Sequence, residues 1–137
     1  MATVRDAMTT SPKTLASSAN VVDAAKLMKT EDAGIVPIVD GDRVTGVLTD
    51  RDIAIQVVAE GKDPHSTTIG EIASSNLVTV DPDQDLDEAL RLMARHQVRR
   101  LPVVEEDGRL VGILAQADVA EHAGAQQTGE VVEKISQ

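Results

Sequence analysis

The chain carries one pattern twice, and this internal repeat limits its possible folds more than any other feature. Residues 36–52 read VPIVDGDRVTGVLTDRD, and residues 101–118 read LPVVEEDGRLVGILAQAD. The second copy is one residue longer, and the additional residue, Gly108, falls in a predicted turn. Turns absorb insertions readily, so the pattern predicts two copies of one folded unit.

Each copy predicts the order turn, strand, helix, strand, strand, helix. In the first copy a short helical turn begins at Val4 and an extended piece follows at Thr14-Leu15. Asn20 is a suitable N-cap for a helix that runs to about Lys29-Thr30. A hairpin of Ile35–Val39 and Arg43–Leu48 follows, and Thr49 or Asp50 caps the next helix.

The second copy predicts the same elements about 65 residues later. Ile69–Ala73 matches the first turn, Val78–Val80 the extended piece, and Asp85 with Glu88 forms a predicted capping box. Gly124 is expected to end the last helix. We therefore divide the chain into a first repeat (1–60), a linker (61–68), a second repeat (69–124) and a polar tail (125–137).

Composition excludes several classes of function. Of the 137 residues 42% are hydrophobic and none is aromatic, so the core must be built from Val, Ile, Leu, Ala and Met. A net charge of -10 disfavours nucleic-acid and membrane-surface partners. There is no cysteine, and no apolar stretch approaches the ~20 residues that span a bilayer. No signal peptide is visible, and we expect a cytoplasmic protein.

Thr49 and Asp52 are the residues most suited to binding chemistry. They are three positions apart at a predicted helix start, so both side chains can point past its N-terminus. A carboxylate there can accept two adjacent ribose hydroxyls, while the Thr hydroxyl and the free helix N–H groups suit a phosphate. Alternatively, both residues simply cap the helix. The spacing alone leaves the two interpretations open.

Signatures of catalysis are missing from the sequence. It contains no phosphate-binding glycine loop of either common type, no nucleophile elbow and no cysteine nucleophile, so we predict no catalytic residue. His65, His96 and His122 stand in no metal-binding motif, and we predict no metal site.

The repeated motifs resemble the cystathionine-β-synthase (CBS) domain pair, or Bateman module. Val36-Pro37-Ile38-Val39 and Gly46-Val47-Leu48-Thr49-Asp50-Arg51-Asp52 carry the resemblance in the first copy, together with Asp6-Ala7-Met8. Leu101-Pro102-Val103-Val104 and Gly112-Ile113-Leu114-Ala115-Gln116-Ala117-Asp118 carry it in the second. The resemblance covers about residues 1–122. It implies an α+β fold of two βαββα repeats packed about a pseudo-two-fold axis.

The resemblance also implies two nucleotide clefts, each with its ribose motif from one repeat and its base pocket from the other. The first cleft would use Thr49, Asp52, Val98, Arg99, Arg100 and Pro102, with Glu71, Ile72 and Asn76 nearby. The second would use Asp118, Ala33, Gly34, Ile35 and Pro37, with Asp6 and Ala7. Backbone groups before each proline would read the adenine edge, and aliphatic side chains would sandwich the base.

The two clefts differ in their arginine residues and in one missing hydroxyl group. Arg100, and less strongly Arg51, is a candidate for a ligand phosphate. For Arg99 two interpretations stay open: contact with the ligand phosphate, and solvated charge that neutralises Glu105 and Glu106. Ala115 replaces the Thr or Ser of the motif, so we expect the Thr49 cleft to bind better. Gly46 and Gly112 are expected to permit a close backbone approach before each helix.

The implied function is a non-catalytic sensor. Adenine nucleotide (AMP, ADP or ATP) would act as a regulatory ligand, with no required cofactor, and would shift the conformation that an unidentified protein target reads. A homodimer through exposed helices is also implied. Three alternatives stay open: an interaction module with empty clefts, a binder of S-adenosylmethionine or NAD, and an enzyme, which is the least favoured.

Overall fold

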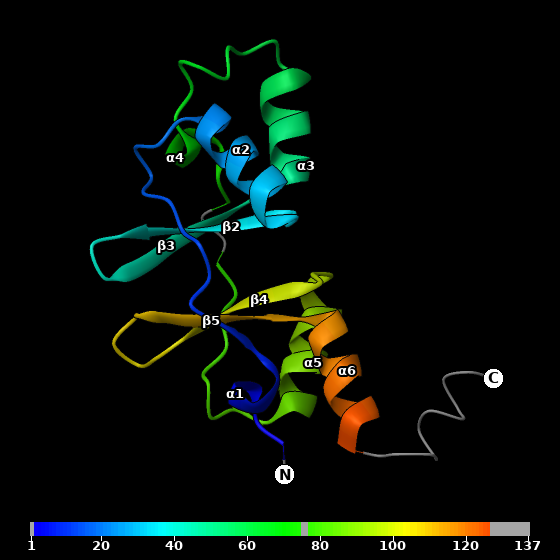
Figure 1. The fold of residues 1–137 in the computed structure, drawn as a ribbon. Helices are drawn as coiled ribbons and strands as arrows, with labels where there is room; N and C mark the ends of the chain where they lie inside the picture. The colour runs from blue at the N-terminus through cyan, green and yellow to red at the C-terminus, as the bar shows by residue number, and fades with distance from the viewer. Residues whose placement is uncertain (1, 75–76, 127–137) are drawn as a thin grey trace, which may run out of the picture. The chain divides into compact units, whose positions relative to one another are not determined.

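The computed structural model describes residues 2–74 and 77–126 and shows a mixed α+β fold. Figure 1 shows each hairpin of strands with helices packed on it. The two predicted repeats are confirmed as repeated sets of strands and helices. No helix among these residues is long and apolar enough to cross a membrane.

The chain forms two compact units that do not coincide with the sequence repeats. The Asp52 unit contains Pro12–Leu77 together with Asp107–Leu110. The Asp118 unit contains Val78–Glu106, the described residues from Val111 onward, and residues 2–11.

The Asp52 unit is organised around an antiparallel hairpin. Strands β2 (Ile35–Asp40) and β3 (Arg43–Thr49) pair with Ile35 opposite Thr49, and a bulge lies between Ile38 and Val39. Leu15 adds a parallel bridge to β2 and Ser74 an antiparallel bridge to β3. The extended piece predicted at Thr14-Leu15 is thereby confirmed.

Helices complete the Asp52 unit. Helix α2 (Val21–Glu31) begins after Asn20, whose side chain accepts a hydrogen bond from the Asp23 N–H at 2.9 Å, as predicted for an N-cap. The second helix is divided into α3 (Asp50–Ile53) and a π-helix, η1 (Ala54–Val58), and α4 (Ile69–Ile72) follows the linker. The buried core of this unit consists of Val21, Ala24, Met28, Val36, Ile38, Leu48, Val57, Ile69 and Ile72.

The Asp118 unit repeats the arrangement. Its sheet has the order β1-β5-β4, formed by Thr9–Thr10, Leu110–Ala115 and Arg100–Val104, and Val80 bridges β4 in parallel. Helices α1 (Val4–Ala7), α5 (Leu86–His96) and α6 (Gln116–Gln126) complete it. Its buried core consists of Val4, Val80, Leu86, Ala89, Met93, Leu101, Val103, Leu114 and Val119.

Each unit is built on the hairpin of one sequence repeat, but its short helix and the extended residues after that helix come from the other repeat. In the Asp52 unit the Ile69 N–H donates to the Ala19 carbonyl at 2.8 Å, and Ser74 pairs with Val47. In the Asp118 unit the Val4 N–H donates to the Gln84 carbonyl at 2.9 Å, in the equivalent position. Helix α1 therefore belongs to the unit built on the second hairpin, and α4 to the unit built on the first.

The close approaches expected at Gly46 and Gly112 are confirmed. A Cβ atom on Gly46 would lie 3.0 Å from the Ser74 carbonyl oxygen. A Cβ atom on Gly112 would lie 2.8 Å from the Thr9 carbonyl oxygen and 2.7 Å from the Met8 sulfur. These glycines therefore allow the exchanged segments to lie against β3 and β5.

Two local predictions are wrong. Asp85 caps α5 by accepting a hydrogen bond from the Asp87 N–H at 2.9 Å, so it does not form the capping box predicted with Glu88. Gly124 lies inside α6, which continues to Gln126. A single glycine costs a helix only about 1 kcal/mol relative to alanine, so it need not end one.

Candidate functional site

Thr49 and Asp52 hold each other in a reciprocal arrangement at the end of β3. Thr49 is the N-cap of α3, and its Oγ1 accepts a hydrogen bond from the Asp52 N–H at 3.1 Å. The Thr49 N–H in turn donates to Asp52 Oδ2 at 2.9 Å. This is the capping interpretation left open by the spacing, and the structure bears it out.

Capping leaves some polar atoms of Thr49 and Asp52 free to bind other groups. No described residue donates a hydrogen bond to Asp52 Oδ1, and the Thr49 hydroxyl, which accepts at its oxygen, keeps its own proton available. Both side chains are half-buried, so their orientation is fixed while they remain accessible. The pair thus presents one carboxylate acceptor and one hydroxyl donor side by side.

The start of β2 lies beside this motif within the Asp52 unit. The Asp50 N–H donates to the Gly34 carbonyl at 3.0 Å, and a Cβ atom on Gly34 would lie 3.0 Å from Asp50 Oδ2. Gly34 therefore brings the chain that enters β2 against the first turn of α3. Arg51 is exposed in that same turn.

The equivalent motif of the Asp118 unit is only half complete. The Ala115 N–H donates to Asp118 Oδ2 at 3.0 Å, as the Thr49 N–H does to Asp52 Oδ2. Ala115 has no hydroxyl oxygen that could accept a hydrogen bond from the Asp118 N–H. The Gln116 N–H donates to the Arg99 carbonyl at 2.8 Å, which matches the contact between Asp50 and Gly34. The two motifs therefore share a backbone frame and differ by one hydroxyl group.

The predicted site residues are distributed over both units. The Asp52 unit contains Thr49, Arg51, Asp52, Glu71, Ile72, Ala33, Gly34, Ile35 and Pro37, and the Asp118 unit contains Asp118, Asp6, Ala7, Val98, Arg99, Arg100 and Pro102. Asn76 lies outside the described residues. Ile72 is only 2% exposed and belongs to the core, whereas Arg99 and Arg100 are exposed. Pro37 and Pro102 are also buried.

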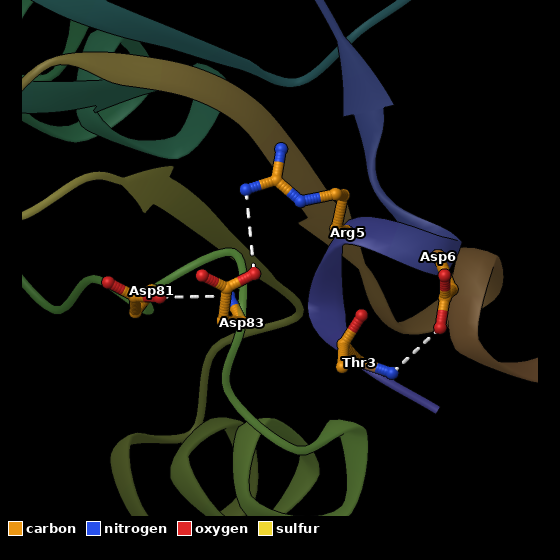
Figure 2. Close-up of polar contacts among 5 residues, drawn as sticks. All are labelled: Thr3, Arg5, Asp6, Asp81 and Asp83. Carbon is orange, nitrogen blue, oxygen red and sulfur yellow. Dashed lines mark hydrogen bonds and ion pairs between the residues drawn. The ribbon is translucent and has the colours of Figure 1, made fainter. Parts of the chain in front are cut away.

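Asp6 has a structural contact that the sequence did not reveal. Its Oδ2 accepts a hydrogen bond from the Thr3 N–H at 3.0 Å, and this bond is the main reason that the pKa of the Asp6 carboxyl is lowered. Arg5, next in the chain, forms an ion pair with Asp83 at 3.5 Å (Figure 2). Glu71, at the corresponding position in α4, also has a lowered pKa, chiefly through the Thr68 N–H.

The carboxylate of Asp40 holds the loop before α2 in place through hydrogen bonds. Its Oδ1 accepts hydrogen bonds from both the N–H and the hydroxyl of Ser17 at 3.0 Å, and its Oδ2 accepts one from the Thr45 hydroxyl at 2.8 Å. These bonds lower the pKa of Asp40, with the Ser17 N–H as the largest cause. The Ser17 carbonyl accepts from the Gly70 N–H in α4, so Asp40 indirectly supports that helix.

Within 2–74 and 77–126 no group of three or more His, Asp or Glu side chains is placed to hold a metal ion.

Comparison with known proteins identifies the family. The model of the CBS domain matches residues 4–58 and again residues 69–124. The chain belongs to the CBS domain family. It contains two CBS domains, and the resemblance drawn from the two proline-containing strands and the glycine-led motifs is confirmed.

Relatives of similar length share this pair of CBS domains. The CBS domain-containing protein YhcV of Bacillus subtilis is 42% identical over 120 residues, which cover 88% of this chain and 84% of that protein. Hypoxic response protein 1 of Mycobacterium tuberculosis is 43% identical over 123 residues, which cover 89% of this chain and 85% of that protein.

Solved structures of CBS domain pairs share the fold. The structure of Hypoxic Response Protein I, described with two coordinated zinc ions, matches with a TM-score of 0.80 at 43% identity and covers 89% of this chain and 99% of that one. The CBS domain pair of protein MJ0100, in complex with 5′-methylthioadenosine and S-adenosyl-L-methionine, matches with a TM-score of 0.83 at 29% identity. That match covers 93% of this chain and 99% of the other.

Proposed function

We propose that this CBS domain pair is a non-catalytic regulatory module that binds an adenosyl ligand, with the ribose on Asp52 and a phosphate on Thr49. The observation that carries the proposal is the reciprocal cap of these two residues, which leaves Asp52 Oδ1 and the Thr49 hydroxyl proton unused by described residues. Adjacent ribose hydroxyls are donors that suit such a carboxylate, and a phosphate oxygen suits the hydroxyl.

The structural relatives support this ligand class. Protein MJ0100, whose CBS pair matches most of this chain, was crystallised with 5′-methylthioadenosine and S-adenosyl-L-methionine. The adenine base and the ribose ring with its 2′- and 3′-hydroxyls are the part that these two molecules share with AMP, ADP and ATP. We favour the nucleotides for this chain because Arg100 and Arg51 are exposed cations that can pair with phosphate.

The mechanism is a shift of population. A ligand that contacts residues of both repeats stabilises one arrangement of the chain, and a protein target then distinguishes this arrangement from the others. By the family resemblance, Val98 and the residues around Pro102 would contribute the base pocket of the Asp52 motif, and Ala33 to Ile35 that of the Asp118 motif. A second copy of the chain is the proposed partner in a cytoplasmic homodimer.

Thermal melting with candidate ligands tests the proposal. The chain has no Trp, Tyr or Phe and absorbs very little at 280 nm, so a co-purified nucleotide would appear as a 260 nm band that is lost after denaturation and filtration. We expect millimolar AMP, ADP or ATP to raise the melting temperature, because a ligand that binds the native state stabilises it. Unchanged melting with these nucleotides, NAD and S-adenosylmethionine would reject an adenosyl ligand.

The two aspartates provide an internal comparison. Asp52→Ala should weaken binding of the same ligand by at least about tenfold, which corresponds to the loss of one charge-assisted hydrogen bond. Asp118→Ala should have a smaller effect, because its motif lacks the hydroxyl. Isothermal titration calorimetry of both variants measures this difference, and the reverse order would contradict the assignment.

A ligand-free interaction module is the second candidate, and Ala115 is the observation in its favour. With alanine at this position the Asp118 motif presents only a carboxylate. If nucleotides leave the melting temperature unchanged while light scattering still gives a dimer mass, this second function is preferred.

A further inference from the structure

Each hairpin turns at an aspartate followed by a glycine, and the two pairs have different surroundings. Asp40-Gly41 connects β2 to β3, and Asp107-Gly108 lies between β4 and β5. Both glycines have a positive φ, of +66° for Gly41 and +91° for Gly108. The sequence contains no other Asp-Gly pair, so each pair serves as a comparison for the other.

An aspartate before glycine can react with its own main chain. The glycine nitrogen attacks the aspartate Cγ, a Cγ–N bond closes a succinimide ring, and the carboxyl hydroxyl leaves as water with the amide hydrogen. Water then adds to the original main-chain carbonyl and breaks its bond to nitrogen, which leaves isoaspartate. The reaction consumes and returns one water and needs no other reactant. Glycine favours it because no side chain covers the attacking nitrogen.

The contacts of the Asp40 carboxyl oppose this reaction. Its Oδ1 accepts the N–H and the hydroxyl of Ser17, and its Oδ2 accepts the Thr45 hydroxyl. These bonds lower the pKa of Asp40, so they favour the ionised form, which has no hydroxyl to lose. Asp40 is also the last residue of β2, where it pairs with Arg43. Ring closure at Gly41 would have to break these contacts.

The Asp107 carboxyl is placed for the reaction instead. Its Oδ1 accepts a hydrogen bond from the Arg109 N–H at 3.0 Å. Because this bond spans only Gly108, it keeps the Asp107 Cγ close to the Gly108 nitrogen. No other residue in the described part of the chain donates to this carboxyl. Asp107 is exposed and lies outside both strands, so strand pairing does not hold its backbone.

We propose that Asp107 is a modification site at which the second hairpin turn converts to isoaspartate, while Asp40 stays unmodified in the folded chain. Isoaspartate places the side-chain Cβ in the main chain, so the turn becomes longer by one carbon. The Gly108 carbonyl accepts the Val44 N–H at 3.3 Å, and a Cβ atom on Gly108 would lie 3.2 Å from the Arg43 Cγ. The modification therefore alters the contact between this turn and β3 within the Asp52 unit.

Incubation of the full chain in water enriched in heavy oxygen tests the proposal. Opening of the succinimide adds one solvent oxygen to the modified aspartate, and trypsin then separates the two sites in peptides 30–43 and 101–109. We expect the native chain to label peptide 101–109 at least about tenfold faster, the ratio that one hydrogen bond to a charged group can produce. In urea the two peptides should label at similar rates. Equal labelling of the native chain, or none in peptide 101–109, would overturn the proposal.

Matched variants assign the difference to the contacts described. Asp107→Glu should abolish labelling of peptide 101–109, because glutamate would have to close a larger ring. Ser17→Ala combined with Thr45→Val removes two of the three hydrogen bonds to Asp40 and should speed labelling of peptide 30–43. Asp42→Asn, in the same peptide, should not. If the double variant labels this peptide no faster than the parent chain, the proposed protection of Asp40 is rejected.

Hydrogen exchange measures the consequence for the turn. The Val44 amide should exchange faster in the chain isolated with isoaspartate at position 107 than in the unmodified chain, because its hydrogen bond to the Gly108 carbonyl is weakened. Unchanged exchange at Val44 would reject the proposed effect on β3. Neither measurement involves a nucleotide, so its outcome is independent of the proposed function.

Discussion

A single hydroxyl separates the two ribose motifs, and it should influence both stability and binding. Thr49→Ala removes the acceptor of the Asp52 N–H, which should lower the free energy of unfolding by about 1 kcal/mol, as for other N-cap losses. Ala115→Thr should raise the free energy of unfolding, because the Ala115 N–H already bonds Asp118 as the Thr49 N–H bonds Asp52, and the new hydroxyl could accept the Asp118 N–H. Denaturant unfolding measures both effects, and a stabilising Thr49→Ala would contradict the capping role.

The three hydrogen bonds to Asp40 should make stability depend on pH. They lower its pKa below the ordinary value of 3.8, so the folded state binds this proton less readily than the unfolded state. The stabilisation is therefore fully present above about pH 4 and is lost as the pH falls through the lowered pKa.

Asp40→Asn tests this dependence. The variant should melt at a lower temperature than the parent chain at pH 7, and the difference should shrink as the pH approaches 2, since the parent loses the same charge there. Melting curves across this range, with exposed Asp42→Asn as the control, provide the measurement. A difference that grows on acidification would contradict the sign of the pKa shift.

At the scale of elements, Gly46 and Gly112 determine how closely the exchanged strands approach. Gly112→Ala places a methyl group 2.8 Å from the Thr9 carbonyl oxygen, and backbone cannot move aside as the Met8 side chain can. We expect a loss of about 1–3 kcal/mol in unfolding free energy, typical of overpacking.

Gly46→Ala meets its nearest atom at 3.0 Å and should cost less than Gly112→Ala. Denaturant titrations of both variants give the order. If Gly112→Ala leaves stability unchanged, the closeness of β1 to β5 does not constrain this position.

Elements with a local chemical signature were predictable from the sequence. Asn20 was predicted as an N-cap, and the next helix was predicted to start at Thr49 or Asp50, because capping involves only residues two or three positions away; the structure places the second cap at Thr49. Gly108, with φ of +91°, lies in the turn where the longer copy has its additional residue. The capping box predicted for Asp85 and Glu88 is not formed because the Asp85 side chain accepts the Asp87 N–H instead, and sequence spacing does not decide which N–H an N-cap carboxylate accepts.

Contacts between distant residues were not predictable. Nothing in the sequence around Ser17 indicates that Asp40, 23 residues away, binds both its N–H and its hydroxyl. The pairing of Ser74 with Val47 likewise depends on which hairpin the segment meets. For the candidate site, Thr49 and Asp52 were found because their geometry is local, while Ile72 proved to be a core residue of the Asp52 unit.

At the scale of the whole molecule, cutting the linker should not release two folded repeats. A fragment of residues 1–62 lacks Ile69 and Ile72, which belong to the core of the Asp52 unit, and a fragment of residues 63–137 lacks Val4 of the other core. We expect each fragment alone to be poorly folded and an equimolar mixture to regain helical circular dichroism.

Size-exclusion chromatography of the mixture should show a one-to-one complex with a concentration-dependent melting temperature. Cooperative melting of either fragment alone, unchanged on mixing, would contradict the exchange of α1 and α4 between the repeats.

The same exchange indicates how a chain of this kind can originate. A gene encoding a single repeat would produce a protein whose short helix completes the unit of a neighbouring copy, so its folding would require two molecules to meet. Duplication and fusion of that gene through the segment 61–68 would convert the encounter into an intramolecular step, independent of concentration. In this chain the two copies differ at the motif position that Thr49 holds in the first repeat and Ala115 in the second.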